Sequence, residues 1–340
     1  MNLTDIPALR RYWYPLCQDS DLDKGPLAQR LLGVDLVLWK SDDGKPNAVR
    51  DRCPHRTAKL SRGFVENGAI VCGYHGWAFE GSGKCVKIPQ RADPAATGKM
   101  RVDAFHAQTY GGHVWVALET PVEDIPVFAE DGDPSWRRIP EFVENWACSA
   151  LRVMENEFDN AHIEYVHQAT FGNTRDPIPA ENEIEEFAGG FVARAVVRAA
   201  NRKIGADYTG ATGELTTRTT VHRYWFPFLR KLELTFPNGL CHRIVTATVP
   251  VDDAHTRLVQ WVYRNDTDAD VPAEKAIAFD RAVTLEDKDI LEATDPYVPL
   301  RDYMTAERHM PSDKPGLIMR RMLVAAADAD IAPVGAQGDD

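Results

Sequence analysis

The chain has 340 residues, of which 44% are hydrophobic and 26% charged, so it is too apolar to be disordered and long enough for two domains. Its 39 Lys and Arg against 51 Asp and Glu give a formal net charge of −12. Such an acidic surface repels phosphate backbones and anionic headgroups, which argues against nucleic-acid or membrane-surface binding. The N-terminus lacks the apolar stretch of a signal peptide, and no segment has the ~18 consecutive apolar residues of a membrane span. We therefore expect a cytoplasmic protein, in which six sparse cysteines are reduced and a functional cysteine binds metal.

The first third of the chain predicts an antiparallel β domain. An apolar run at residues 31–40 ends at a Ser-Asp-Asp-Gly turn, and short runs at residues 77–80 and 84–88 are joined through Gly-Ser-Gly. A proline-interrupted acidic stretch, residues 119–126, then has the composition of a linker. We place a domain boundary near residue 122.

The rest of the chain predicts a helix, an antiparallel sheet and a second helix, in that order. Residues 150–167 have helical composition, and a second helical run begins after Pro272. Between them lie strand-like runs at residues 191–198, 214–226, 232–236, 242–249 and 257–264. This order indicates an α+β protein with domains at residues 1–122 and 123–325. Residues 326–340 are rich in Ala, Asp and Gly without periodicity, so we expect a disordered tail.

Two pairs of cysteine and histidine form a C-x-H … C-x-x-H pattern: Cys53 with His55 and, after sixteen intervening residues, Cys72 with His75. Two sulfide-bridged irons can be held by such pairs, with one iron on both cysteines and the other on both histidines, as in a Rieske [2Fe–2S] centre. A structural Cys₂His₂ zinc site uses the same residue types, so ligand chemistry alone leaves both open. The flanking sequences, Cys-Pro-His-Arg and Cys-x-Tyr-His-Gly-Trp-x-Phe, resemble the cluster-binding loops of the Rieske family and favour the cluster.

A second group of metal-ligand residue types follows beyond the expected domain boundary. Asp159, His162 and His167 form the pattern D-x₂-H-x₄-H. On a regular helix two histidines five residues apart point about 140° apart, so joint ligation needs a bend or a π-type bulge between them. Downstream of a Rieske motif, however, this pattern resembles the catalytic domains of Rieske non-haem iron oxygenases, with all three residues at matching positions.

Non-haem Fe(II) oxygenases bind iron through two histidines and one carboxylate, and Asp287 is our candidate for the third ligand. Its helical neighbours are apolar: Phe279, Val283, Ile290 and Leu291. A carboxylate on such a face is costly unless a cation meets it. Asp280 also borders this face and stays a runner-up on periodicity, whereas Asp289 has more polar neighbours. The Glu-Asp-x-x-Ile pattern resembles the C-terminal iron-binding helix of the family and selects Asp287.

The whole chain resembles the α subunits of Rieske non-haem iron oxygenases, most closely the short, single-subunit monooxygenase branch. That branch includes vanillate and dicamba O-demethylases, chlorophyllide and pheophorbide oxygenases and saxitoxin-pathway hydroxylases. The resemblance implies a helix-grip catalytic domain and a head-to-tail homotrimer, in which the cluster of one subunit faces the mononuclear iron of the next. It also implies that Asp159 accepts hydrogen bonds from His162 and from His75 of the neighbouring subunit. Asn156 falls where some relatives place an asparagine near the iron.

No G-x-G-x-x-G follows a predicted strand, so we expect no nicotinamide or flavin site. Electrons from NAD(P)H should arrive through a separate reductase, directly or through a ferredoxin. The expected function is that of a monooxygenase that uses O₂ to hydroxylate a C–H bond of a small aromatic or polycyclic substrate. Where the carbon bears oxygen or nitrogen, the outcome is O- or N-demethylation. A Rieske electron-transfer protein is the non-enzyme alternative, and the retained His162, His167 and Asp287 argue against it.

Overall fold

The computed structural model describes residues 1–331 apart from residues 92–96, 98, 173–176, 201–213 and 237. The chain divides into two compact units. Pro7–Pro126 forms one unit, and Met1–Ile6 joins the residues from Val127 onward in the other. Among the described residues, none of the helices combines the length and the apolar composition that a bilayer-spanning segment requires.

The observed division differs from the expected domains at the N-terminus. The boundary expected near residue 122 lies close to Pro126, but the first six residues do not belong to the first unit. Leu3 is buried, and Thr4 donates its backbone N–H to Oδ1 of Asp253 at 2.9 Å. These long-range contacts have no periodic signal in the sequence.

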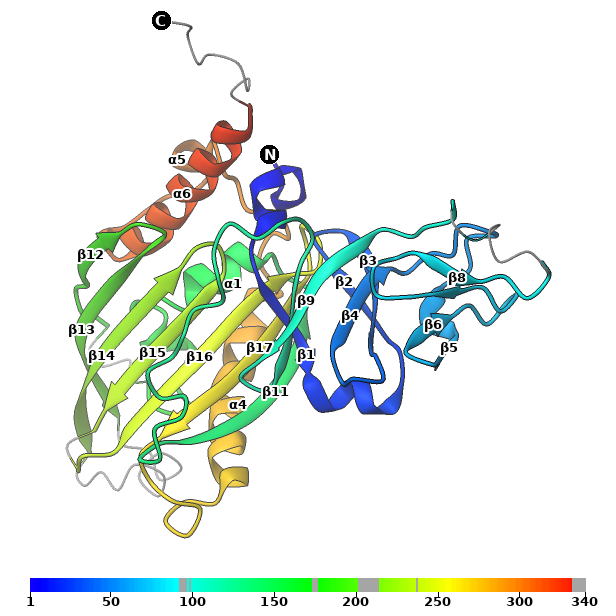
Figure 1. Ribbon diagram of the computed structural model, residues 1–340. Helices are drawn as coiled ribbons and strands as arrows, with labels where there is room; N and C mark the ends of the chain where they lie inside the picture. Colours follow the sequence, from blue (N-terminus) through cyan, green and yellow to red (C-terminus); the bar gives the residue numbers. More distant parts are fainter. Residues whose placement is uncertain (92–96, 98, 173–176, 201–213, 237, 332–340) are drawn as a thin grey trace, which may run out of the picture. The chain divides into compact units, whose positions relative to one another are not determined.

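The first unit consists of antiparallel sheets, as expected (Figure 1). A six-stranded sheet has the order β1-β10-β9-β4-β3-β2, with bounds Tyr14–Gln18 (β1), Leu27–Leu31 (β2), Val34–Lys40 (β3), Pro46–Arg50 (β4), Ala104–Tyr110 (β9) and His113–Ala117 (β10). A four-stranded sheet follows the order of the chain, with bounds Phe64–Glu66 (β5), Ala69–Val71 (β6), Ala78–Phe79 (β7) and Cys85–Lys87 (β8). Short 3-10 helices cover Pro7–Arg11, Asp19–Lys24 and Leu60–Arg62.

One hydrophobic core joins these two sheets. Trp39 of β3 is fully buried in it and donates its indole N–H to the carbonyl of Gly68, between β5 and β6, at 2.9 Å. The same core contains Cys53 and Cys72. Packing in this core therefore fixes both cysteines, while the loops that carry them reach the surface of the unit.

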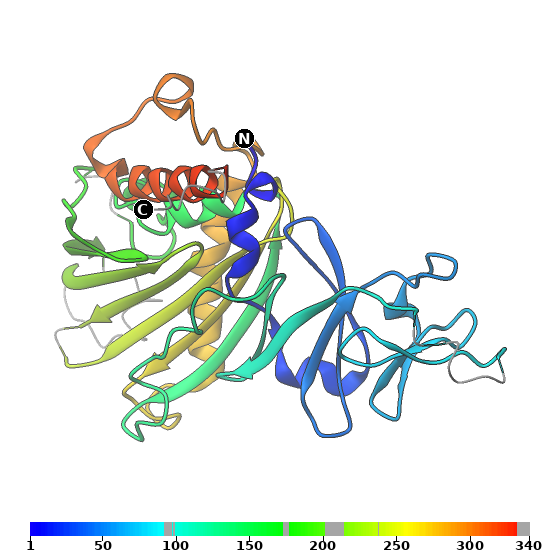
Figure 2. The same ribbon diagram turned by 45° about the horizontal axis from the view of Figure 1, so that its top comes forward.

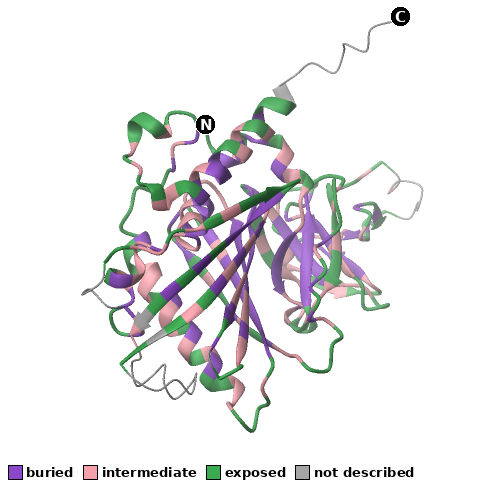
Figure 3. Cartoon of the chain, turned by 90° about the vertical axis from the view of Figure 1, so that its left-hand side faces the viewer, coloured by how far each residue is buried: buried purple, intermediate pink, exposed green. Residues whose placement is uncertain are grey.

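The second unit is built on a seven-stranded antiparallel sheet with the order β11-β17-β16-β15-β14-β13-β12. Its strands are Arg137–Trp146 (β11), Glu183–Phe187 (β12), Gly190–Ala200 (β13), Leu215–Trp225 (β14), Leu229–Thr235 (β15), Cys241–Pro250 (β16) and Thr256–Arg264 (β17). The edge strand β12 is mostly exposed, whereas β16 and β17 are mostly buried (Figure 3). The antiparallel sheet and its long helix confirm the expected α+β, helix-grip class.

Two helices of this unit, α1 and α4, pack against the sheet. The helices are Ala150–Asn156 (α1), Ile163–Val166 (α2), Ala273–Leu291 (α4), Tyr303–Ala306 (α5) and Lys314–Ile331 (α6), and 3-10 turns lie at Leu3–Asp5 and Pro311–Asp313. The helix α4 runs along the sheet (Figure 1), and its Ala276 packs against Ile139 of β11 and Val262 of β17. The helix α6 lies beside α1 (Figure 2).

Two expectations about helices need correction. The helical segment expected at residues 150–167 is interrupted, because α1 ends at Asn156 and α2 begins only at Ile163. In between, the Asp159 carboxylate accepts the backbone N–H groups of Ala161 and His162 at 2.8 and 3.1 Å, a local turn that competes with the helix. A disordered tail was expected from residue 326, but residues 326–331 belong to α6. The Ala-rich sequence suits a helix, and Ala327 is buried. The rest of the expected tail, residues 332–340, lies outside the described residues.

Candidate metal centres

The two cluster loops have the same backbone closure although the cysteine and histidine are spaced differently in each. The N–H of Thr57 donates to the carbonyl of Cys53, and the N–H of Gly76 donates to that of Cys72, both at 2.9 Å. Both donors have positive φ, 59° at Thr57 and 72° at Gly76. A positive φ suits glycine and costs a threonine energy, so tertiary structure must impose it in the first loop.

Each loop buries its cysteine and presents its histidine. Cys53 and Cys72 are 2% and 1% exposed, whereas the His55 and His75 rings lie at the surface with centroids 4.5 Å apart. The ring of Trp77 stacks on His55 at 4.7 Å. This inner pair of sulfurs and outer pair of imidazoles suits a centre whose two irons have different ligands.

A single zinc ion fits the same four residues less well. A tetrahedral zinc site would bring its ligand atoms within about 4 Å of one another. Among the described residues, the group of ligand atoms that converges within 4.8 Å is formed by His162, His167 and Asp287, and it includes neither cluster loop. The geometry of the loops therefore favours the binuclear cluster.

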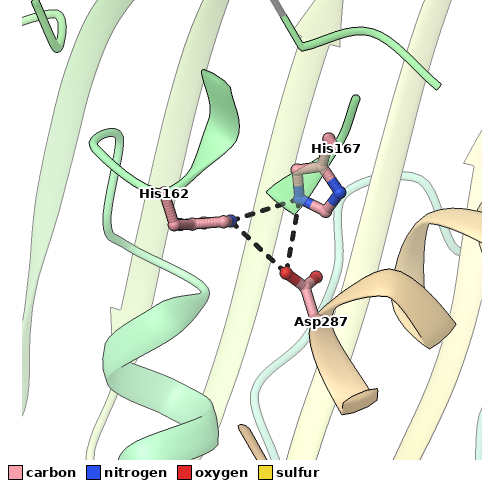
Figure 4. Close-up of side chains that lie close together, drawn as sticks. All are labelled: His162, His167 and Asp287. Carbon is pink, nitrogen blue, oxygen red and sulfur yellow. Dashed lines mark hydrogen bonds and ion pairs between the residues drawn. The ribbon is translucent and has the colours of Figure 1, made fainter. Parts of the chain in front are cut away.

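His162, His167 and Asp287 converge at one point in the second unit (Figure 4). The two Nε2 atoms are 3.2 Å apart, and Oδ1 of Asp287 lies 3.4 Å from the first and 3.3 Å from the second. The histidines occupy the two ends of α2, one at its N-cap and one at its C-cap, and Asp287 projects from α4. Because the helix is broken before His162 and ends at His167, the two rings can meet.

The buried carboxylate and the two imidazoles of this group suit a cation. Oδ1 of Asp287 is buried without a hydrogen-bond donor. Burial raises the pKa of this carboxyl to about 7 and lowers the pKa of His167 to about 3. Two imidazole nitrogens and one carboxylate oxygen are the ligand set that non-haem iron sites use. The residues therefore fit a mononuclear iron.

Carboxylates orient both histidines. Nδ1 of His162 lies 3.3 Å from Oδ2 of Asp159, and Nδ1 of His167 lies 3.0 Å from Oε2 of Glu286. A carboxylate only accepts, so each Nδ1 carries the proton and each Nε2 presents a lone pair to the shared point. Glu286 also accepts from the Thr170 hydroxyl at 2.7 Å. Glu286 was not predicted from the sequence, although its position next to Asp287 is a signal for such a partner.

The remaining candidates take different places. Asn156 lies within hydrogen-bonding reach of the Asp287 carboxylate, close to where the resemblance places it. The runner-up Asp280 is instead buried against His242, with Oδ2 3.0 Å from Nε2. Asp289 is exposed on α4. Neither belongs to the converging group.

A cavity of about 150 Å³ opens beside this group, between α4 and one face of the sheet. An apolar cavity of this size holds one benzene ring. Its apolar lining comes from alternate residues of the strands and from α4, including Val197, Leu232, Leu234, Ile244, Phe279 and Val283. The three metal-ligand side chains and the adjoining apolar cavity together form a site where a small flat molecule can bind next to a metal ion.

The comparisons with known proteins agree with this geometry. A model of the Rieske [2Fe-2S] domain matches residues 12–110, and a model of the vanillate O-demethylase oxygenase C-terminal domain matches residues 146–329, more than half of the chain. The chain belongs to the Rieske non-haem iron oxygenases. It carries a Rieske cluster and a mononuclear iron and is the oxygenase component of a monooxygenase that acts on small organic substrates.

Among its relatives is methylxanthine N1-demethylase NdmA of Pseudomonas putida, 28% identical over 324 residues that cover 93% of this chain and 88% of the relative. The solved structure of NdmA with caffeine has a TM-score of 0.79 at 28% identity and covers 96% of this chain and 94% of that one. Dicamba monooxygenase bound to dicamba shares the fold, with a TM-score of 0.80 at 23% identity over 96% of this chain and 99% of that one.

Proposed function

We propose that this oxygenase hydroxylates a C–H bond of a flat, single-ring substrate at the group formed by His162, His167 and Asp287. The carrying observation is that these three donor atoms lie 3.2–3.4 Å apart at the wall of an apolar cavity. When bound there, iron supplies O₂ activation, using electrons delivered through the cluster. The protein holds the two Nε2 atoms as lone-pair donors through Asp159 and Glu286. The apolar walls exclude water from the reacting carbon.

Cys53, His55, Cys72 and His75 are the proposed cluster ligands, and Asp159 is the proposed link between the two centres. One face of Asp159 contacts His162, and its side chain is still 26% exposed. A second imidazole N–H, from His75 of the partner subunit in a homotrimer, can therefore reach it. A cytoplasmic location belongs to this proposal because Cys53 and Cys72 must stay reduced to bind iron. NAD(P)H supplies the electrons through a separate reductase, with or without a ferredoxin.

Demethylation is the second candidate. It is supported by the family model for vanillate O-demethylase and by the relationship to the methylxanthine demethylase NdmA. The same hydroxylation, applied to a methyl group on oxygen or nitrogen, releases formaldehyde. The site residues do not distinguish the two outcomes, since only the bound substrate differs.

The test is a turnover assay with the holoenzyme, a surrogate reductase, NADH and ¹⁸O₂. Substrates are offered in pairs, each a methoxy- or methyl-substituted ring with its unsubstituted parent, and products are read by mass spectrometry. One ¹⁸O atom per product supports hydroxylation, and formaldehyde from the methoxy member alone supports demethylation. His162→Ala is the control, because it should keep the cluster colour and form no product. Product formation by His162→Ala, or NADH oxidation that yields only peroxide with every substrate, would contradict the proposal.

A further inference from the structure

Two arginines, Arg218 and Arg230, line the cavity, and among the described residues only Arg230 has a carboxylate partner. Arg230 forms an ion pair with Glu157, and Asp280 pairs with His242. In the described part of the chain, no carboxylate lies within ion-pair distance of the Arg218 guanidinium, and its Nε atom is buried without a hydrogen-bond partner. The cavity therefore contains one cation whose charge the described protein does not balance.

Arg218 is placed in the cavity by strand geometry. It lies on β14 opposite Val197 of β13, and alternate residues of β14 face the same way, so Thr220 and His222 line the cavity with it. Arg223, five residues along β14, points to the opposite side of the strand and does not line the cavity. The direction of Arg218 is thus fixed by the register of a long antiparallel strand rather than by a loop.

A stack of three side chains connects Arg218 to the metal group. The guanidinium lies over the ring of Phe171, 4.3 Å from its centroid. The Phe171 ring in turn stacks on His167 at a centroid distance of 4.7 Å. Arg218 is therefore held one aromatic ring away from the proposed iron ligand, and a molecule that contacts the guanidinium would extend alongside that ring.

Arg218 keeps its charge at neutral pH. Burial lowers the pKa of its guanidinium to about 10, which still leaves it protonated. A half-buried cation costs free energy unless an anion or several hydrogen-bond acceptors meet it, and stacking on Phe171 compensates only part of that cost. A planar guanidinium offers two parallel N–H donors that match a carboxylate.

We propose that Arg218 binds the carboxylate of the substrate, so that the substrate class is a small aromatic carboxylic acid. This inference rests on the proposed function and adds the substrate class to it. In this arrangement the carboxylate pairs with Arg218, the ring lies against the apolar lining that includes Leu234 and Phe279, and the far side of the ring faces the iron ligands. The cavity volume of about 150 Å³ admits one ring.

The test is a binding measurement that needs no turnover. The holoenzyme, with its cluster oxidised, is titrated calorimetrically with benzoates that carry hydroxy or methoxy groups and with the matching benzamides. Each amide keeps the size and planarity of the acid and removes its charge. At least one benzoate should bind about tenfold more tightly than its amide, as a bidentate charged pair allows.

Variants show whether Arg218 is the cause. Arg218→Gln should weaken binding of that benzoate about tenfold and leave the benzamide unchanged, and Arg218→Lys should restore part of the difference. Arg223→Gln, on the same strand but outside the cavity, is the matched control and should change neither. Iron content and the cluster spectrum verify that each variant is folded.

The outcomes separate this inference from the proposed function. If no benzoate binds more tightly than its amide, or if Arg218→Gln weakens both equally, the assignment of Arg218 is wrong. Oxygenated product from neutral rings in the same enzyme would then show that the function stands without it. Conversely, selective benzoate binding that depends on Arg218 supports the carboxylate site. If turnover then fails with every acid, that failure counts only against the proposed reaction.

Discussion

Nδ1 of His167 lies 3.0 Å from Oε2 of Glu286, a residue 119 positions further along the chain. The same Oε2 accepts from the Thr170 hydroxyl at 2.7 Å, and Oε1 accepts the backbone N–H of Ala169 at 3.2 Å, so the carboxylate is itself held in place. This contact fixes the tautomer of His167 and turns its Nε2 toward His162 and Asp287. It links α2 to α4 and therefore joins the two segments that supply the proposed iron ligands.

Glu286→Gln should weaken binding of the mononuclear iron about 10- to 100-fold and leave the cluster unchanged. The amide can turn its NH₂ group toward Nδ1, which then no longer has a dedicated acceptor. The measurement is iron retention during competition with a chelator, together with the visible spectrum. Asp289→Asn, on the exposed face of the same helix, is the control. Equal iron retention in both variants would show that Glu286 does not orient the ligand.

Gly172→Ala should disturb the same ligand from the backbone side. A Cβ at Gly172 would lie 2.6 Å from the carbonyl oxygen of Ile163 and 3.0 Å from that of His167, so α2 would have to move. We expect a loss of about 1–3 kcal/mol of stability and weaker binding of the mononuclear iron. Gly239→Ala is the control, because its surroundings are open although its φ is +86°. It should lose some stability and keep its iron, and the same iron loss in both variants would contradict this account.

Asp159→Asn should interrupt electron transfer without removing either metal. The amide has one acceptor oxygen where the carboxylate has two, so it cannot hold His162 and a second imidazole in the same way. We expect normal reduction of the cluster and a reoxidation by O₂ and substrate that is slower by orders of magnitude. Stopped-flow absorbance of the prereduced cluster is the measurement. Near-normal reoxidation coupled to product would refute the bridging role.

Glu130→Gln should destabilise the second unit. The Glu130 side chain is fully buried between Lys231, at 3.1 Å, and Arg243. Burial alone would raise the pKa of this carboxyl, but its hydrogen bond from Arg243 and the charge of Lys231 outweigh burial and hold it below the usual value. Removing one partner of such a pair costs about 3–5 kcal/mol. Urea unfolding is the measurement.

The pH dependence gives this prediction a direction. Since the pKa of Glu130 is lower in the folded state, its stabilisation is present above the unfolded pKa of about 4.3 and is lost as the pH falls through the folded value. The difference between wild type and Glu130→Gln should therefore shrink in acid. Glu185→Gln removes the exposed pair with Arg194 and should change stability by less than about 0.5 kcal/mol. A large, pH-independent effect of Glu130→Gln would point to packing instead.

Features with a local pattern were predictable from the sequence. Five of the seven strands of the large sheet, β13 to β17, were expected from strand-like runs, whereas β11 and β12 were not. Asp287 was selected by its apolar helical neighbours and by the family pattern. The break before His162 was not predicted, because it depends on the side chain of Asp159 capturing two backbone N–H groups. The roles of Glu286 and Arg218 were also missed. The role of Glu286 depends on its contact with His167, and that of Arg218 on the lack of a carboxylate partner among the described residues. Contacts between distant segments of the chain cannot be read from residue spacing.

The central claim is that one chain holds two separate iron centres, and iron counting with electron paramagnetic resonance tests it most directly. The account predicts about three irons and two sulfides per chain and, after reduction, the signal of a cluster with mixed histidine and cysteine ligation. Asp287→Ala should contain about two irons with the same signal, while Asp280→Asn, whose carboxylate faces His242, should keep all three. Colourless protein that contains only zinc after reconstitution with iron and sulfide, or a third iron that survives Asp287→Ala and is lost from Asp280→Asn, would contradict it.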